Sequence, residues 1–185
     1  MELGLRFHAE RTPNPDSIKW VLGEAVAEPG VTADFAEPVG PAVSPLAARL
    51  FAVPGVTRVF FAANFVTVTK REEVEWTDVA QPLVDALKAF AASGEQALGP
   101  EFQAPEATPS GDVVERILRI LEEEVRPAVA MDGGDVVFAG YRDGVVEVHL
   151  QGSCAGCPSS TATLRFGIEA RLREAIPEVT QVVSI

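Results

Sequence analysis

Both cysteines of the chain lie in one nine-residue stretch, Gly152-Ser153-Cys154-Ala155-Gly156-Cys157-Pro158-Ser159-Ser160. Two thiols separated by two residues can reach the same metal ion or the same edge of an iron–sulfur cluster. Zinc sites and iron–sulfur clusters usually take four protein ligands, so this CxxC pair, Cys154 and Cys157, supplies half of a site. The other half must come from elsewhere in the chain or from a second copy of it.

The elements around the CxxC pair are predicted from hydrophobic periodicity and from the positions of Pro and Gly. A helix that starts at Asp112 should end near Arg126, because Pro127 follows. Two strands joined by a turn lead directly into the CxxC pair, and Pro158 opens the next helix. We expect the order helix, strand, strand, CxxC, helix, strand, over 112–126, 136–141, 145–150, 158–175 and 179–183.

The first half of the chain is predicted to form a separate domain. Its helices start at Ser44 and near Asp78, and Gly94 ends the second one. Residues 95–111 contain three Pro and three Glu without sustained periodicity, which indicates a linker. We therefore expect an α+β protein with two small α/β-sandwich-type domains. These are an N-terminal domain over 1–94, with strands at 6–10, 18–22, 56–61 and 65–70, and a C-terminal domain over 112–185.

Composition narrows the function classes. The chain has 185 residues and a net charge of −12 with no basic cluster, so binding to nucleic acid is not expected. No apolar run is long enough to span a membrane, so no membrane association is expected. The N-terminus has no presequence, which predicts a cytoplasmic location. Thiols are reduced there, so a close Cys pair indicates metal binding or redox chemistry.

Several chemistries remain open for the CxxC pair. Cys157 stands just before the predicted helix at Pro158, where free N–H groups and the helix dipole favour thiolate. A thioredoxin-like fold needs more chain after the motif than is present. Zinc needs two more ligands, for which the candidates are His8 and His149, although two chains could share one zinc. Two incidental packing cysteines are the remaining structural alternative.

An iron–sulfur cluster shared by two chains is the interpretation that we favour from the residues. A two-fold dimer duplicates each ligand, so two CxxC pairs supply the four thiolates of one cluster. A shared site on a small loop favours transfer over storage, which predicts a scaffold or carrier. We find no nucleophile–base pair, carboxylate pair or phosphate-binding glycine loop, and predict no enzyme activity. The alternative is a monomeric thiol–disulfide oxidoreductase with a reversible Cys154–Cys157 disulfide.

The second half resembles the NifU-like C-terminal domain of Nfu-type iron–sulfur scaffold and carrier proteins. The matching residues are Arg126-Pro127, Asp132-Gly133-Gly134-Asp135 and the stretch that contains the CxxC pair. The first half resembles the N-terminal domain of the same family. Its matching residues are Thr12-Pro13-Asn14-Pro15, Ser44-Pro45-Leu46-Ala47, 51–59, Trp76 and Asn64-Phe65-Val66-Thr67-Val68-Thr69-Lys70, with Asn64 where an acidic residue is expected.

The resemblance implies a protein that holds a 4Fe-4S cluster between two subunits and delivers it to apo proteins, with a 2Fe-2S cluster as the other possible cargo. Cys154 and Cys157 fall on the family's ligand positions. The implied partners are a second copy of the chain, a cluster donor and apo client proteins. Because mitochondrial members carry a presequence, the N-terminus suggests a bacterial cytoplasmic member. For Gly133 and Gly134 two interpretations stay open: a turn with positive φ, or support of the cluster loop.

Overall fold

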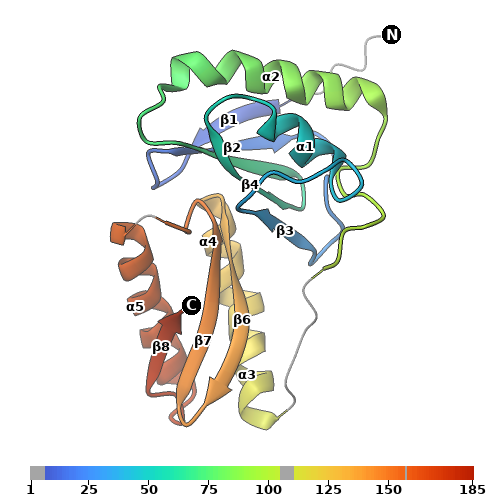
Figure 1. The fold of residues 1–185 in the computed structure, drawn as a ribbon. Helices are drawn as coiled ribbons and strands as arrows, with labels where there is room; N and C mark the ends of the chain where they lie inside the picture. Colours follow the sequence, from blue (N-terminus) through green and yellow to red (C-terminus); the bar gives the residue numbers. More distant parts are fainter. Residues whose placement is uncertain (1–6, 105–110, 157) are drawn as a thin grey trace. The chain divides into compact units, whose positions relative to one another are not determined.

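The computed structural model describes residues 7–104, 111–156 and 158–185. The chain divides into two compact units, Met1–Ala104 and Pro105–Ile185 (Figure 1). Each unit combines helices with one small sheet, so the expected α+β class is confirmed.

The first unit contains a five-stranded sheet in the order β1-β2-β5-β4-β3, in which all neighbouring strands are antiparallel. The expected hairpin between β4 and β5 is present, and its turn places Ala63 at φ 45°. The five strands are β1 (Phe7–Arg11), β2 (Ser17–Leu22), β3 (Thr32–Phe35), β4 (Val56–Ala62) and β5 (Phe65–Lys70).

Two helices cover one face of this sheet, α1 (Pro45–Phe51) and α2 (Trp76–Ser93) (Figure 1). The Ser44 Oγ accepts a hydrogen bond from the Ala47 N–H at 3.0 Å, so the predicted N-cap of α1 is confirmed. Gly94 follows α2 in the left-handed conformation that closes a helix. The helices contribute Leu46, Leu50, Val79, Leu83, Leu87 and Phe90 to the core of the unit.

The sequence predicted a linker over residues 95–111. In the structure, residues 95–104 instead pack against the first unit, which corrects the first part of that prediction. The Ser44 Oγ donates to the Ala97 carbonyl at 2.6 Å, and the Gly99 N–H donates to the Val43 carbonyl at 2.8 Å. Ala97 is buried, and the ring of Phe102 contacts the ring of Phe35 edge-on. The apolar residues of this segment pack on the first unit even though their spacing follows neither helix nor strand.

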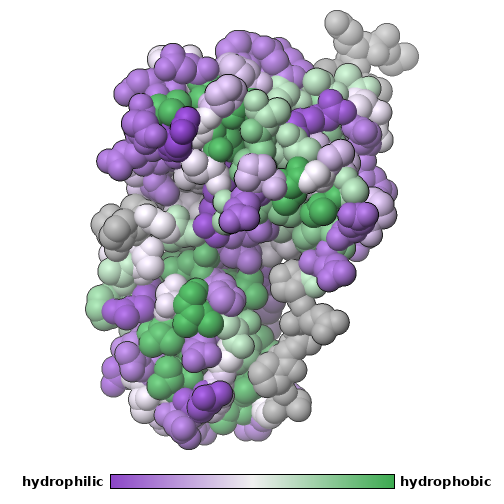
Figure 2. Space-filling view, viewed as in Figure 1, coloured by the Kyte–Doolittle hydropathy of each residue, from purple (hydrophilic) through white to green (hydrophobic). Residues whose placement is uncertain are grey.

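The second unit contains a three-stranded sheet of β6 (Gly134–Arg142), β7 (Val145–Gly152) and β8 (Gln181–Ser184), in that order. β6 and β7 form an antiparallel hairpin whose turn holds Asp143 and Gly144 at positive φ. β7 and β8 are parallel and are connected by α5 (Pro158–Ala175). On this unit, hydrophobic residues gather over the sheet in the view of Figure 2. Alternate strand residues, including Val137, Val145 and Val183, are only half-buried.

The first helix of the second unit runs past Pro127, so the prediction that it ends near Arg126 is wrong. It consists of α3 (Asp112–Ile120), a π-helical turn η1 (Leu121–Val125) and α4 (Arg126–Met131). The Arg126 N–H donates to the Leu121 carbonyl, five residues earlier. A proline lacks an N–H and its ring clashes with the carbonyl four residues before it in a regular helix. The wider π-turn just before Pro127 accommodates the ring, and the helix continues.

Candidate functional site

The end of the β6–β7 hairpin positions Cys154. Gly134, the first residue of β6, pairs with Gly152, the last residue of β7. The chain then turns sharply: Gly152 has φ +63°, and the Ala155 N–H donates to the Gly152 carbonyl at 3.1 Å. Cys154 is only 6% exposed and belongs to the apolar core of the second unit. The predicted ligand is therefore anchored on the core side of its loop.

The thiol of Cys154 lies against the backbone of Gly134. A Cβ atom at position 134 would be 2.6 Å from the Cys154 Sγ and 2.7 Å from the Gln151 carbonyl oxygen. No side chain fits at these distances, so the residue must be glycine. Of the two glycines, only Gly133 has a positive φ, +77°. The interpretation as a turn with positive φ therefore holds for Gly133 alone. For Gly134, the close approach of the Cys154 sulfur explains why the residue is glycine.

Ser153 joins the cysteine loop to the loop before β6. Its backbone N–H donates to the Gly133 carbonyl at 3.2 Å, and its Oγ donates to the Asp132 carbonyl. From the other side, the Thr161 Oγ1 in the first turn of α5 donates to the Cys154 carbonyl at 3.0 Å. These three hydrogen bonds fix the backbone on both sides of the Cys154 thiol.

A buried ion pair holds the Asp132–Asp135 loop against the helix. The Arg126 Nε and Nη2 each donate to one carboxylate oxygen of Asp135, both at 2.8 Å, and the Val136 N–H also donates to Asp135 Oδ1 at 2.8 Å. Asp135 is 3% exposed. The hydrogen bond to Asp135 raises the pKa of the Arg126 guanidinium above its ordinary value. A buried bidentate ion pair of this kind holds the Asp132–Asp135 loop, whose Gly134 contacts the Cys154 thiol, in one position.

This ion pair is the feature that the residue-by-residue reasoning missed. Arg126 and Asp135 were both within the motifs that match the family, but no role followed from their positions. One signal was available: Asp135 stands directly before the predicted strand 136–141, which begins with the apolar residues Val136 and Val137, and an aspartate that is buried there needs a charged partner.

The other candidate ligands are placed as follows. Cys157 lies outside the described residues, and α5 begins at the next residue, Pro158. His149 is exposed on β7, and its Nδ1 hydrogen-bonds with the Ile185 carbonyl at 3.0 Å. His8 belongs to the first unit, where its ring pairs with Glu10 at 3.0 Å. Among the described residues, no three His, Cys, Asp or Glu side chains are grouped to hold a metal ion.

Two protein-family profiles match the chain. Residues 7–94 match the family described as "Scaffold protein Nfu/NifU N terminal", and residues 117–183 match the "NifU-like domain". Among curated proteins, the human "NFU1 iron-sulfur cluster scaffold homolog, mitochondrial" is 42% identical over 182 residues. The alignment covers 97% of this chain and 71% of the human protein. The Drosophila erecta protein of the same name is 41% identical, with 97% and 64% covered.

Two solved structures match part of the chain at lower identity. A NifU-like protein from Saccharomyces cerevisiae is 21% identical with a TM-score of 0.46, covering 52% of this chain and 87% of its own. The protein SAV1430 from Staphylococcus aureus is 20% identical with a TM-score of 0.41, covering 44% and 98%.

The comparisons correct the predicted location. Both curated relatives are named as mitochondrial proteins, which overturns the cytoplasmic location inferred from the N-terminal residues. In the described part of the chain, no helix combines the length and the apolar character needed to cross a membrane.

Proposed function

Because the chain belongs to the Nfu/NifU family of iron–sulfur cluster scaffold proteins, we propose that it holds a 4Fe-4S cluster between two copies and transfers it to apo proteins. Cys154 and Cys157 of each copy are the proposed ligands. The cluster is cargo, and a 2Fe-2S cluster is the second candidate for it. The chain acts as a scaffold or carrier and is not an enzyme.

One observation carries this proposal: a single chain supplies too few ligands. The whole chain has two cysteines and two histidines. His8 is far from the CxxC pair in sequence, and His149, five residues before Cys154, is exposed on β7 with its ring hydrogen-bonded to the Ile185 carbonyl. A 4Fe-4S cluster commonly takes four cysteine thiolates, and a two-fold axis doubles the two that are present. The hydrophobic patch over the sheet of the second unit (Figure 2) is the kind of surface that proteins use for association.

The structure around Cys154 also suits a cargo site. Ser153 and Cys154 are buried, Ala155 is half-buried and Gly156 is exposed, so the loop passes from the core to the surface within four residues. An anchored first ligand fixes the geometry, and the exposed residue between the two cysteines leaves the loop accessible to a partner. We assign cluster binding to residues 112–185, and we assign no chemistry to residues 1–94, which contain no cysteine.

Anaerobic reconstitution with iron and sulfide tests the proposal, with mass in solution measured on the same sample. We expect about two irons and two sulfides per chain, in a dimer that forms only with the cluster. One 2Fe-2S cluster per chain gives the same ratio, and Mössbauer spectra distinguish the two.

Cys154→Ser and Cys157→Ser should each lose the cluster and the dimer. Ala155→Ser is the matched control, because it adds the same hydroxyl to the same loop without removing a thiol. If either cysteine variant retained wild-type iron and sulfide, the ligand assignment would be wrong. A monomer that binds no cluster but cycles between dithiol and disulfide would favour the oxidoreductase.

A further inference from the structure

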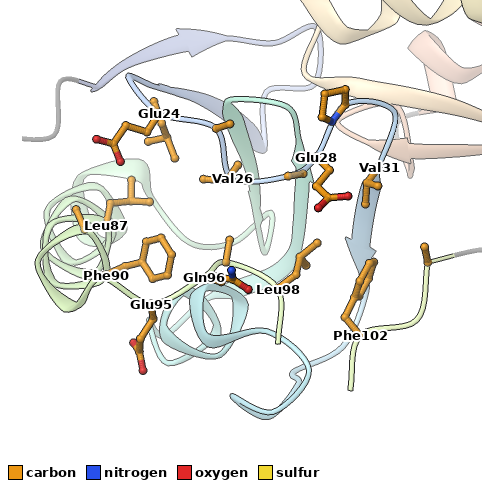
Figure 3. A pocket seen from close by; sticks show the side chains of 18 residues that line it. Glu24, Val26, Glu28, Val31, Leu87, Phe90, Glu95, Gln96, Leu98 and Phe102 are labelled. Carbon is orange, nitrogen blue, oxygen red and sulfur yellow. The ribbon is translucent and has the colours of Figure 1, made fainter. Parts of the chain in front are cut away.

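The first unit, whose sequence contains no cysteine, has an open cavity of about 750 Å³ (Figure 3). It lies between the loop after β2, the C-terminal half of α2 and residues 95–104. Figure 3 shows Leu87 and Phe90 reaching into it from α2, with Phe102 on the opposite side. A cavity of this size can take one or two large side chains or a small molecule.

The walls are apolar and the rim is acidic. Phe90 and Leu87 are buried within the core of the unit, and Leu98 and Phe102 pack against it. Three exposed carboxylates, Glu24, Glu28 and Glu95, also line the cavity, whereas its lining contains no Lys, Arg or His among the described residues. The cavity therefore combines an apolar interior with a negative border.

Only one of the three carboxylates is neutralised by an ion pair in the part of the chain that the structure describes. The Arg49 Nη2 donates to Glu95 at 2.5 Å, and this hydrogen bond lowers the pKa of Glu95. Glu24 and Glu28 have no ion-pair partner among those residues. Two uncompensated negative charges next to apolar walls favour an occupant with a positive charge next to an apolar group.

We propose that this cavity docks a segment of a partner protein that inserts a large apolar side chain and carries Lys or Arg beside it. The inference rests on the proposed function, because a protein that transfers a cluster must dock a donor or an acceptor. Charge complementarity identifies the partner's chemistry: a basic, amphipathic polypeptide. It also assigns a role to the unit that has no thiol.

Fluorescence anisotropy with the full chain tests the docking. The probe is a short labelled helical peptide with Leu on one face and Arg on the other, and the comparison probe has Glu in place of Arg. We expect the Leu/Arg peptide to bind and the Leu/Glu peptide not to bind. Ala91→Trp, which fills the cavity from α2, should weaken binding at least about tenfold. Glu24→Lys combined with Glu28→Lys should weaken it about tenfold.

The matched control is Glu72→Lys combined with Glu73→Lys, which changes the net charge equally in the turn just before α2, whereas Ala91 is near the C-terminal end of that helix. It should leave peptide binding unchanged. An equal loss in the control would mean general attraction to an acidic protein, and undiminished binding to Ala91→Trp would exclude the cavity; either result overturns the proposal. If Ala91→Trp does not fold, as judged by circular dichroism, the comparison of the Glu24/Glu28 double variant with the Glu72/Glu73 double variant still tests the proposal.

Two further readouts separate this proposal from the function of the CxxC pair. The cavity variants should load iron and sulfide as the wild type does, and Cys154→Ser should still bind the Leu/Arg peptide. If the unmodified chain bound neither peptide while the Glu24/Glu28 reversal changed its mass in solution, a second copy would be the occupant and the proposal would be wrong. Failure of cluster loading in every variant would refute the function without affecting the docking site.

Discussion

Gly134→Ala tests whether Cys154 depends on the glycine beneath it. The added Cβ would lie 2.6 Å from the Cys154 Sγ, about 1 Å closer than a relaxed contact of roughly 3.5–4.0 Å. Rotation of the thiol alone does not relieve the clash, because the Gln151 carbonyl oxygen is 2.7 Å away on the paired strand. The strands must separate or the cysteine loop must move, so we expect a loss of about 1–3 kcal/mol in the stability of the second unit.

The assay can follow the two units separately. Both tryptophans, Trp20 and Trp76, are in the first unit, and the single tyrosine, Tyr141, is in the second. Calorimetry should show the transition of the second unit lowered by about 4–8 °C per kcal/mol, whereas tryptophan fluorescence should report an unchanged first unit. Cluster loading should fall as well, because the anchored thiol is displaced.

Gly140→Ala is the control in the same strand. Its Cβ would meet only the flexible end of Glu147, at 3.0 Å, and Gly140 has no positive φ. This substitution should leave stability and cluster loading near the wild type. If Gly134→Ala behaved like Gly140→Ala in both assays, close packing under Cys154 would not be required and the reasoning would be refuted.

Two ion pairs give further predictions. Asp135→Asn breaks the buried bidentate pair with Arg126, and should lower the stability of the second unit by about 1–3 kcal/mol and reduce cluster loading, measured by calorimetry and iron content. Unchanged values for both would show that the pair does not hold the loop. The hydrogen bond from Arg171 lowers the pKa of Glu124 below 4.5, so its small contribution to stability is present above that pH and is lost as the pH falls through the lowered pKa. In Glu124→Gln the melting temperature should fall less steeply between about pH 5 and pH 3, and an unchanged slope would contradict the assignment.

Elements with strong local signals were predictable from the sequence. The Ser44 cap, the Gly94 helix end and the β6–β7 hairpin each depend on a few adjacent residues, and the structure has them where those residues stand. The prediction failed at Pro127, because the rule that proline ends a helix assumes a regular α-turn before it, and this chain has a π-turn. It also failed at residues 95–104, whose apolar side chains pack without any regular period.

The candidate site was predictable only in part. The spacing of the two cysteines is a local pattern, and it predicts cysteine chemistry while leaving metal, cluster and redox interpretations open. The contact between Gly134 and Cys154 joins the first residue of β6 to the loop after β7, and the Arg126–Asp135 pair joins a helix to a strand. Such contacts follow from the fold, and no spacing within the motifs indicates them.

The π-turn has a geometric consequence for the helix that contains it. An α-helix advances about 100° per residue, so residues spaced by four drift about 40° around the axis at each step. The buried residues here keep this spacing, at Ile117, Leu121, Val125 and Val129. Each residue of the wider π-turn advances by a smaller angle than in an α-helix, so the turn removes part of this accumulated rotation. The apolar residues before the π-turn can thus stay packed against the sheet while Arg126, after it, reaches Asp135. A one-residue deletion in this turn would rotate one part of the helix relative to the other, so that either the apolar face or Arg126 would point away from its partner.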